Sequence, residues 1–220
     1  MINIIKFGEE VKGYSIPVLN EREIRAAAGI LFLAMLISLV LILSGGNFVP
    51  IKYMITLFLT DFIIRVFINP KFAPTLIVGR WIVRNQTPEY VGAKQKKFAW
   101  IIGIVLASIM FIHMVVINAF SPITGIICLI CLIFLFFESA FGICLGCKFY
   151  SMIYKEKAQY CPGEICEVKD RHEIQKISLN QWLIVLGLAA YMLVVGLLFD
   201  ENFRMMPYDI FGIEDTSQQK

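Results

Sequence analysis

Fifty residues between Lys97 and Lys148 carry a single formal charge, on Glu138. A typical soluble domain has roughly 25% charged residues, whereas this chain of 220 residues has 17% and is 58% hydrophobic. A water-soluble fold of this size would lack the polar surface needed to cover its core. The sequence therefore excludes a soluble enzyme domain, a disordered chain and a nucleic-acid-binding protein. It predicts an all-α, polytopic transmembrane bundle whose main partner is the lipid bilayer.

Five apolar segments approach the roughly 20 residues that a membrane-spanning helix needs, so four or five spans are expected. These segments are residues 26–44, 51–68, 98–118, 123–144 and 178–199. The second segment contains Lys52, Asp61 and Arg65, and it ends at Asn69-Pro70 because proline disfavours helix at the residue before it. The first 25 residues mix acidic and basic side chains, unlike a cleaved signal peptide. The first apolar segment is therefore expected to remain as a span.

Basic residues predict the orientation, because lysine and arginine accumulate on the cytoplasmic side of membrane proteins. Sixteen of the 20 lysines and arginines fall in three segments, and five spans place all three segments in the cytoplasm. Within the second basic segment, residues 75–84 are too short to span. They are expected to form a helix, either at the membrane interface or packed under the bundle. The predicted domains are a cytoplasmic N-terminal segment (1–25), a transmembrane bundle (26–199) with cytoplasmic loops 69–97 and 145–177, and an acidic C-terminal tail (200–220).

Polar side chains inside the spans are the first candidates for function, because charges in a membrane are costly and usually face a partner or a wet cavity. Asp61 and Arg65 are four residues apart on one helix face, so they can form an ion pair. That pair is either structural or part of a gate or anion site, and Asp61, Arg65 and His113 are the candidate substrate-binding residues. His113 is alternatively a packing residue. Glu138 is either a neutral, hydrogen-bonded acid or a proton shuttle, since burial favours its protonated form.

Six cysteines provide the second set of candidates. Cys128 and Cys131 lie among leucine, isoleucine and phenylalanine in the fourth span, which favours inert packing. The motif Cys144-Leu-Gly-Cys147 lies where that span is expected to meet the cytoplasm, and Cys161 and Cys166 follow in a polar loop. A Cys-x-x-Cys pair can form a disulfide, bind a metal or share a lowered thiol pKa. These four cysteines are therefore the strongest chemical signal in the chain.

Three interpretations of Cys144, Cys147, Cys161 and Cys166 remain open. The first pair is a redox couple that exchanges with the second pair, or all four thiolates hold one zinc ion, or the thiols carry sulfane sulfur as persulfides. Permanent disulfides are the least expected, because the cytoplasm is reducing. A helix C-terminus disfavours a thiolate, whereas the start of a new helix favours one. The sequence allows either environment for Cys144.

Two resemblances bear on this cysteine arrangement. A Cys-x-x-Cys pair at the end of a span, with a second cysteine pair in the next loop, resembles the arrangement in quinone-coupled disulfide-generating membrane proteins. Those proteins place their cysteines outside the cytoplasm, whereas the basic loops of this chain place them inside. The resemblance therefore covers the four cysteines and not their orientation.

The second resemblance covers most of the chain and is carried by four segments: Asp61-Phe-Ile-Ile-Arg65, Asn69-Pro-Lys-Phe-Ala-Pro74, Gln95-Lys-Lys-Phe98 and Glu138-Ser-Ala-Phe-Gly-Ile-Cys-Leu-Gly-Cys147. In these segments the chain resembles a family of bacterial inner-membrane proteins known as a domain of unknown function. The members of that family are often found alongside thioredoxin-like or sulfurtransferase proteins, which are therefore the expected partners. The resemblance implies thiol or sulfur chemistry near Cys144 and Cys147, and it draws attention to Asp61, Arg65, Pro70 and Glu138.

Together these features predict a thiol redox or sulfur-handling protein at the cytoplasmic face of a bacterial inner membrane, with Cys144, Cys147 and Glu138 as catalytic residues. One thiol attacks a disulfide, a persulfide or a thiosulfate-like sulfur, and the other thiol resolves the mixed species. Glu138 shuttles a proton, while Arg65 attracts the anionic substrate. The alternatives are a transporter or channel for a small solute, and a zinc-stabilised scaffold that docks a soluble partner. Zinc is the one cofactor that the residues suggest.

Overall fold

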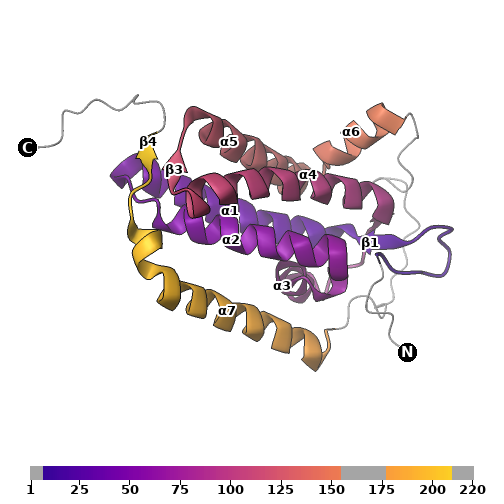
Figure 1. The fold of residues 1–220 in the computed structure, drawn as a ribbon. Helices are drawn as coiled ribbons and strands as arrows, with labels where there is room; N and C mark the ends of the chain where they lie inside the picture. The colour runs from indigo at the N-terminus through magenta and orange to yellow at the C-terminus, as the bar shows by residue number, and fades with distance from the viewer. Residues whose placement is uncertain (1–6, 155–176, 210–220) are drawn as a thin grey trace, which may run out of the picture.

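The computed structural model describes residues 7–154 and 177–209, and these residues form a bundle of long helices with only short strands (Figure 1). Single turns of π-helix extend three of the helices, at Ile64–Ile68 after α2, Ile112–Val116 after α4 and Phe137–Phe141 after α5. The long helices are α1 (Glu21–Gly45), α2 (Val49–Ile63), α4 (Ala93–Phe111), α5 (Pro122–Phe136) and α7 (Leu179–Arg204).

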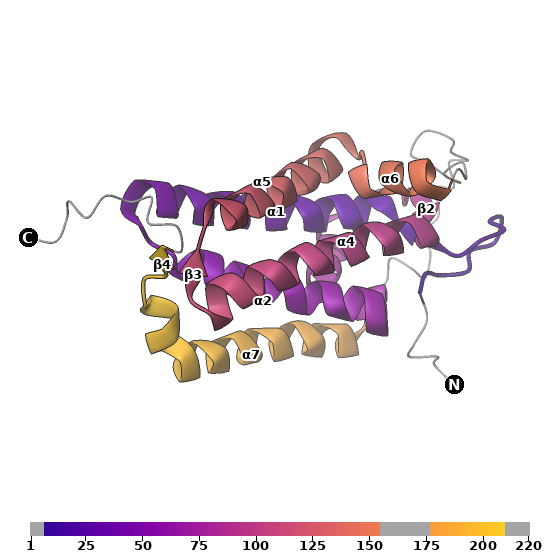
Figure 2. The ribbon, with the colours of Figure 1, turned by 45° about the horizontal axis from the view of Figure 1, so that its top comes forward.

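Two short helices and four short strands lie at the ends of this bundle. Strand β1 (Val18–Asn20) pairs antiparallel with β2 (Tyr90–Gly92). At the other end, β3 (Ala119–Phe120) pairs in parallel with β4 (Tyr208–Asp209). The short helices α3 (Pro74–Ile82) and α6 (Leu145–Tyr154) lie toward β1 and β2 (Figures 1 and 2). We call this side the α3 end of the bundle and the opposite side the β3 end.

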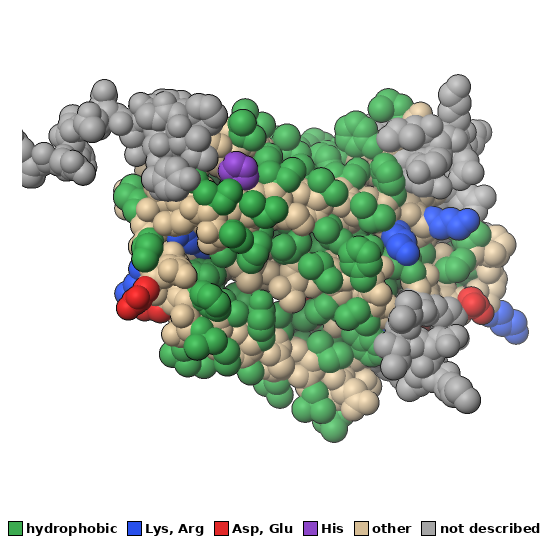
Figure 3. Space-filling model, in the orientation of Figure 1, with side chains coloured by type: hydrophobic (Ala, Val, Ile, Leu, Met, Phe, Trp, Pro, Cys, Tyr) green, Lys and Arg blue, Asp and Glu red, His purple; other side chains and the backbone are tan. Residues whose placement is uncertain are grey.

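The surface of the bundle suits a lipid environment. Four helical segments are long and apolar enough to cross a membrane, namely those at residues 21–45, 93–116, 122–141 and 179–204. Large side chains such as Leu43, Phe67 and Leu197 point outward and are more than 60% exposed. Figure 3 shows hydrophobic side chains over the middle of the visible face, with the charged ones gathered toward its ends. The predicted all-α transmembrane bundle is therefore confirmed.

Helix α2 is the expected additional segment, and it carries charged residues into the bundle. With its π turn it runs from residue 49 to 68 beside α1, α4 and α7 (Figure 1). Lys52 and Asp61 are both buried on it. Lys52 Nζ donates hydrogen bonds to Asn118 Oδ1 and to the carbonyl oxygens of Asn202 and Met205, at 2.6–3.2 Å. This contact ties the end of α7 to the β3 end of the bundle.

The helix boundaries differ from the apolar segments at three places that matter for the site. Helices α1 and α4 begin at Glu21 and Ala93, before the apolar segments that begin at residues 26 and 98. The pairing of β1 with β2 precedes both helices and brings their first turns together. The fourth apolar segment was expected to run to residue 144, but its helix ends at Phe141. Gly142 ends it by adopting the left-handed conformation, with φ of 66°.

The helix expected at residues 75–84 is α3, and it packs closely against α1. A Cβ on Gly79 would lie 2.6 Å from the carbonyl oxygen of Glu23, so only glycine permits this approach. Trp81 and Ile82 remain about half exposed. One side of α3 therefore packs against the bundle, and the other side keeps exposed apolar side chains; its place at the membrane interface stays a prediction.

Candidate functional site

The Cys-x-x-Cys motif begins a new helix rather than ending the preceding span. After the break at Gly142, α6 starts at Leu145, so Cys144 immediately precedes its first turn. The backbone N–H of Cys147 donates to Cys144 Sγ at 3.3 Å, as a helix-capping interaction would. The sequence allows Cys144 either at the end of one helix or at the start of the next. The structure places it at the start of α6, where the helix dipole is positive.

Gly146, inside the motif, allows α6 to pack directly on α4. A Cβ at Gly146 would lie 2.5 Å from the Cβ of Ala99 and 2.8 Å from its Cα. Such distances are far below normal carbon contacts of about 3.5–4.0 Å. The absence of a side chain at residue 146 therefore sets how closely both cysteines approach α4.

A cavity of about 60 Å³ brings three of the sequence-predicted residues together. Arg65, Glu138 and Cys144 all line it: Arg65 comes from the π turn after α2, whereas Glu138 and Cys144 are six residues apart between α5 and α6. The remaining walls are mainly apolar and aromatic, and they include the thiol-bearing residue Cys131, which sequence reasoning had assigned to packing. The aromatic residues lining the cavity are Phe58, Phe62, Trp100 and Phe134.

Lys96 contacts the cavity-lining Glu138 and forms buried ion pairs with two carboxylates. Its Nζ contacts both carboxylate oxygens of Glu21, at 3.0 and 2.8 Å, and also binds Glu138 Oε1. The side chains of Lys96 and Glu21 are 1% exposed, and that of Glu138 is 14% exposed. One ammonium thus offsets two carboxylates within a nearly dry environment. Such a buried group is stable only while all its members are present.

The surroundings of Cys144 favour its protonated form. A side-chain hydrogen bond with Cys147 raises the pKa of the Cys144 thiol well above its usual range, and burial raises it further. The nearby ammonium of Lys96 opposes both effects by favouring the thiolate, while Glu138 again raises the pKa. Because the thiolate is the nucleophilic form, these surroundings lower the fraction of Cys144 that is ready to attack at a given pH.

Asp61 and Arg65 form the ion pair that their spacing predicts, with 2.7 Å between Arg65 Nε and Asp61 Oδ2. Both residues are buried, and Thr75 completes the network: its backbone N–H and its hydroxyl donate to Asp61, and its hydroxyl accepts from Arg65 Nη2. The Arg65 guanidinium also lies 4.4 Å from the Phe62 ring centroid and 5.1 Å from that of Trp100. The pair therefore anchors the first turn of α3 and presents Arg65 to the cavity.

A second buried pair at the same end was missed by the sequence reasoning. Arg80 binds Glu23 Oε2 through Nη2 at 3.0 Å, and Asn20 Nδ2 donates to the same carboxylate at 3.0 Å. Arg80 and Lys96 had been counted among the basic loop residues that set orientation. Helical spacing could have indicated that Lys96 is buried. Lys96, Trp100 and Ala107 follow one another at intervals of four and seven residues and share the buried face of α4.

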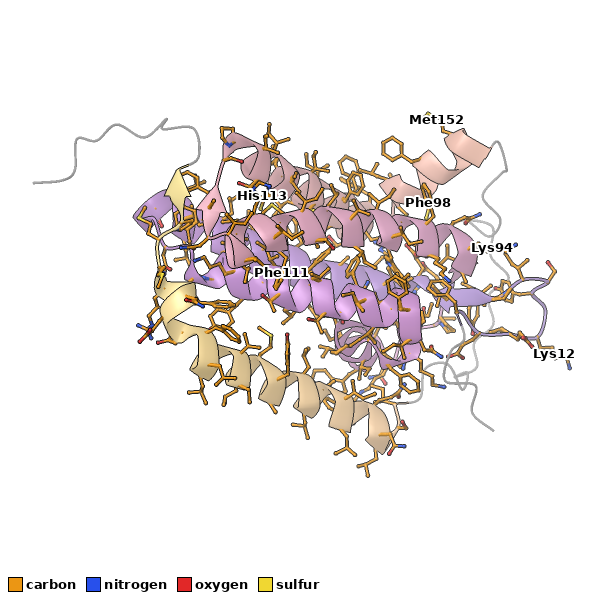
Figure 4. All side chains as sticks on the ribbon, viewed as in Figure 1. Lys12, Lys94, Phe98, Phe111, His113 and Met152 are labelled. Carbon is orange, nitrogen blue, oxygen red and sulfur yellow. The ribbon has the colours of Figure 1, made fainter. Side chains whose placement is uncertain are left out.

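Several candidate residues lie apart from this cavity. His113 is near the β3 end, whereas α6 lies at the α3 end (Figure 4). The Nδ1 atom of His113 is buried without a hydrogen-bond partner among the described residues. Cys128 is buried on α5, and Cys161 and Cys166 lie outside the described residues. Within residues 7–154 and 177–209, no group of three or more His, Cys, Asp or Glu side chains is placed to bind a metal.

These features define a polytopic α-helical membrane protein with a buried ionic cluster and a thiol motif at one end of its bundle. The family described as a domain of unknown function, DUF4395, matches residues 19–155, which is more than half of the chain. The chain therefore belongs to this family. The matched stretch contains α1 to α6 and all residues that line the cavity. No curated protein and no solved structure matches the chain.

Proposed function

We propose that this protein carries out thiol redox or sulfur-handling chemistry at the Cys144–Cys147 pair. The observation that carries the proposal is the shared cavity of Cys144, Glu138 and Arg65, which places a thiol, a carboxyl group and a guanidinium around one space. Three such groups are the parts that attack on sulfur requires, namely a nucleophile, a proton carrier and a hydrogen-bond donor for the substrate.

The contacts of each residue support a distinct role. Cys144 or Cys147 attacks a sulfur atom of the substrate, and the other thiol resolves the mixed species. Glu138 carries the proton, and its ion pair with Lys96 keeps its carboxyl group oriented. Arg65 is neutralised by Asp61, so it contributes hydrogen-bond donors and aromatic contacts rather than a free charge. Arg65 therefore attracts an anionic substrate only at short range.

The proposed location is a bacterial inner membrane with the α3 end in the cytoplasm. The basic residues of the N-terminal segment and of the 69–97 segment favour this orientation under the positive-inside rule. The reducing cytoplasm would keep the motif available as thiols. A thioredoxin-like or sulfurtransferase protein is the expected soluble partner, because such proteins exchange sulfur or reducing equivalents with cysteine pairs.

Replacement of Cys144 or Cys147 by serine tests the proposal in purified, detergent-solubilised protein. Each variant should lose catalytic turnover of thiol–disulfide or persulfide exchange while it still inserts into the membrane. Cys128→Ser is the matched control, since Cys128 is buried on α5 outside the cavity, and it should retain exchange. Full exchange activity in both single variants would refute the proposal.

The same preparation separates the two alternative functions. Solute uptake into proteoliposomes that survives loss of both thiols would indicate a transporter or channel. One tightly bound zinc ion per chain, together with the absence of reactive thiols, would indicate a scaffold whose ligands include Cys161 and Cys166. Either result would count against exchange chemistry at Cys144 and Cys147.

A further inference from the structure

The size of the cavity at Cys144 limits what can occupy it. Its volume is about 60 Å³, whereas a site for one water molecule needs about 10–15 Å³ of such space. The space therefore suits a group of a few atoms, such as a persulfide sulfur with a few water molecules. A glutathionyl group or a loop of a partner protein is far larger than this.

The walls of the cavity also suit sulfur better than they suit water. Phe58, Phe62, Trp100 and Phe134 line it with aromatic rings. Sulfur near aromatic rings is favourable by about 0.3–1.5 kcal/mol per contact. The charged residues that line it are Arg65 and Glu138. A polarizable atom with partial negative charge thus meets both apolar walls and a hydrogen-bond donor.

From this size and lining we propose that Cys144 accepts a single sulfane sulfur atom and holds it as a persulfide in the cavity. The inference rests on the proposed function and narrows it, because it selects sulfur transfer over exchange with a bulky disulfide. Cys147 then acts on the sulfur-loaded Cys144. Cys131 lines the same cavity and forms part of its wall.

The chemistry balances without an external oxidant. The Cys144 thiolate attacks the outer sulfur of a persulfide donor, the donor's S–S bond breaks, and the donor leaves as a thiol after taking up the proton released by Cys144. Glu138 carries that proton. In the second step the Cys147 thiolate attacks the Sγ atom of the Cys144 persulfide. A Cys144–Cys147 disulfide forms and hydrosulfide leaves. A dithiol reductant of the thioredoxin type then reduces this disulfide to two thiols and is itself oxidised to a disulfide.

Sulfur loading distinguishes this inference from general thiol exchange. The Cys147→Ser variant of the full chain is treated in detergent with glutathione persulfide or, separately, with glutathione disulfide. Peptide mapping by mass spectrometry then locates any adduct. The expected result is one added sulfur atom on Cys144 from the persulfide and little or no glutathionyl adduct from the disulfide. The parent protein, which retains Cys147, should instead release hydrosulfide when it is treated with glutathione persulfide.

The outcomes separate the inference from the proposed function. A glutathionyl adduct on Cys144 that forms as readily as the persulfide would overturn the inference while thiol redox chemistry stands. The absence of both adducts would overturn the inference and the proposed function together.

A pair of cavity variants tests where the sulfur resides. Cys131→Met should fill part of the cavity and reduce sulfur loading at Cys144 by at least severalfold relative to Cys131→Ala, which removes the same thiol without filling the space. Both variants remove the Cys131 thiol, so their difference reports on space alone. Equal loading in the two variants, with both eluting as folded protein, would overturn the assignment of this cavity.

Discussion

Replacement of Gly146 by alanine should push α6 away from α4 and slow the chemistry of the thiol motif. The new Cβ would lie 2.5 Å from the Cβ of Ala99, whereas carbon atoms in contact lie about 3.5–4.0 Å apart. The two helices must therefore separate by roughly 1 Å. Overpacking of this kind costs about 1–3 kcal/mol, and a 1 Å displacement of reacting groups can lower a rate by about 100-fold.

A matched glycine and a compensating change make this prediction specific. Gly125→Ala also adds a methyl group in the first turns of a helix, but no atom lies within 4 Å of that position. It should leave both stability and rate close to those of the parent. Combining Gly146→Ala with Ala99→Gly should recover part of the loss, because it removes the clashing Cβ but leaves the Cα of residue 99 at 2.8 Å from the new methyl group.

The measurement is the rate of sulfur or disulfide exchange at Cys144 in detergent, together with the melting temperature of each variant. Gly146→Ala should differ from Gly125→Ala by about 1–3 kcal/mol in unfolding free energy and by a clear loss of rate. If Gly146→Ala matches Gly125→Ala in both quantities, the close approach of α6 to α4 does not position the motif.

Two further predictions concern the charges and protons of the site. Lys96→Met leaves two buried carboxylates without their cation and should cost about 3–5 kcal/mol, lowering the melting temperature by about 6–20 °C, whereas exposed Lys94→Met should change it little. Because the pKa of Cys144 is raised, its alkylation rate should keep increasing with pH above about 8.5, the ordinary thiol pKa. Cys147→Ala removes the main cause and should shift that increase to lower pH; a plateau below pH 8 in the parent would contradict the assignment.

Two sets of buried charges show which contacts helical spacing predicts and which it does not. Asp61 and Arg65 are four residues apart, and helical geometry alone brings their side chains together, so their predicted pair is present. Lys96 binds Glu21 and Glu138, which lie 75 and 42 residues away. No helical period relates these three residues. Their grouping depends on how α1, α4 and the end of α5 pack, and sequence reasoning placed two of them outside the bundle.

The cysteine motif shows the same limit. Its residues indicated thiol chemistry, but the sequence did not decide whether Cys144 ends one helix or begins another. The left-handed Gly142 and the contact of Gly146 with Ala99 decide it. The contact between Gly146 and Ala99 joins two different helices, so no local sequence pattern can reveal it. Cys161 and Cys166 lie outside the described residues, and their part in the chemistry stays a prediction.

The sequence by itself determined the class of this protein, because hydrophobic blocks with so few charges leave a lipid-embedded helical bundle as the stable solution. It also determined the pair of Asp61 and Arg65, since four residues make one helical turn. Only the tertiary structure decided that Arg65, Glu138 and Cys144 line one small cavity and that Lys96 supports it. The physical reason is that a charge or a thiol acquires its partners from packing between helices, and packing joins residues that the chain keeps far apart.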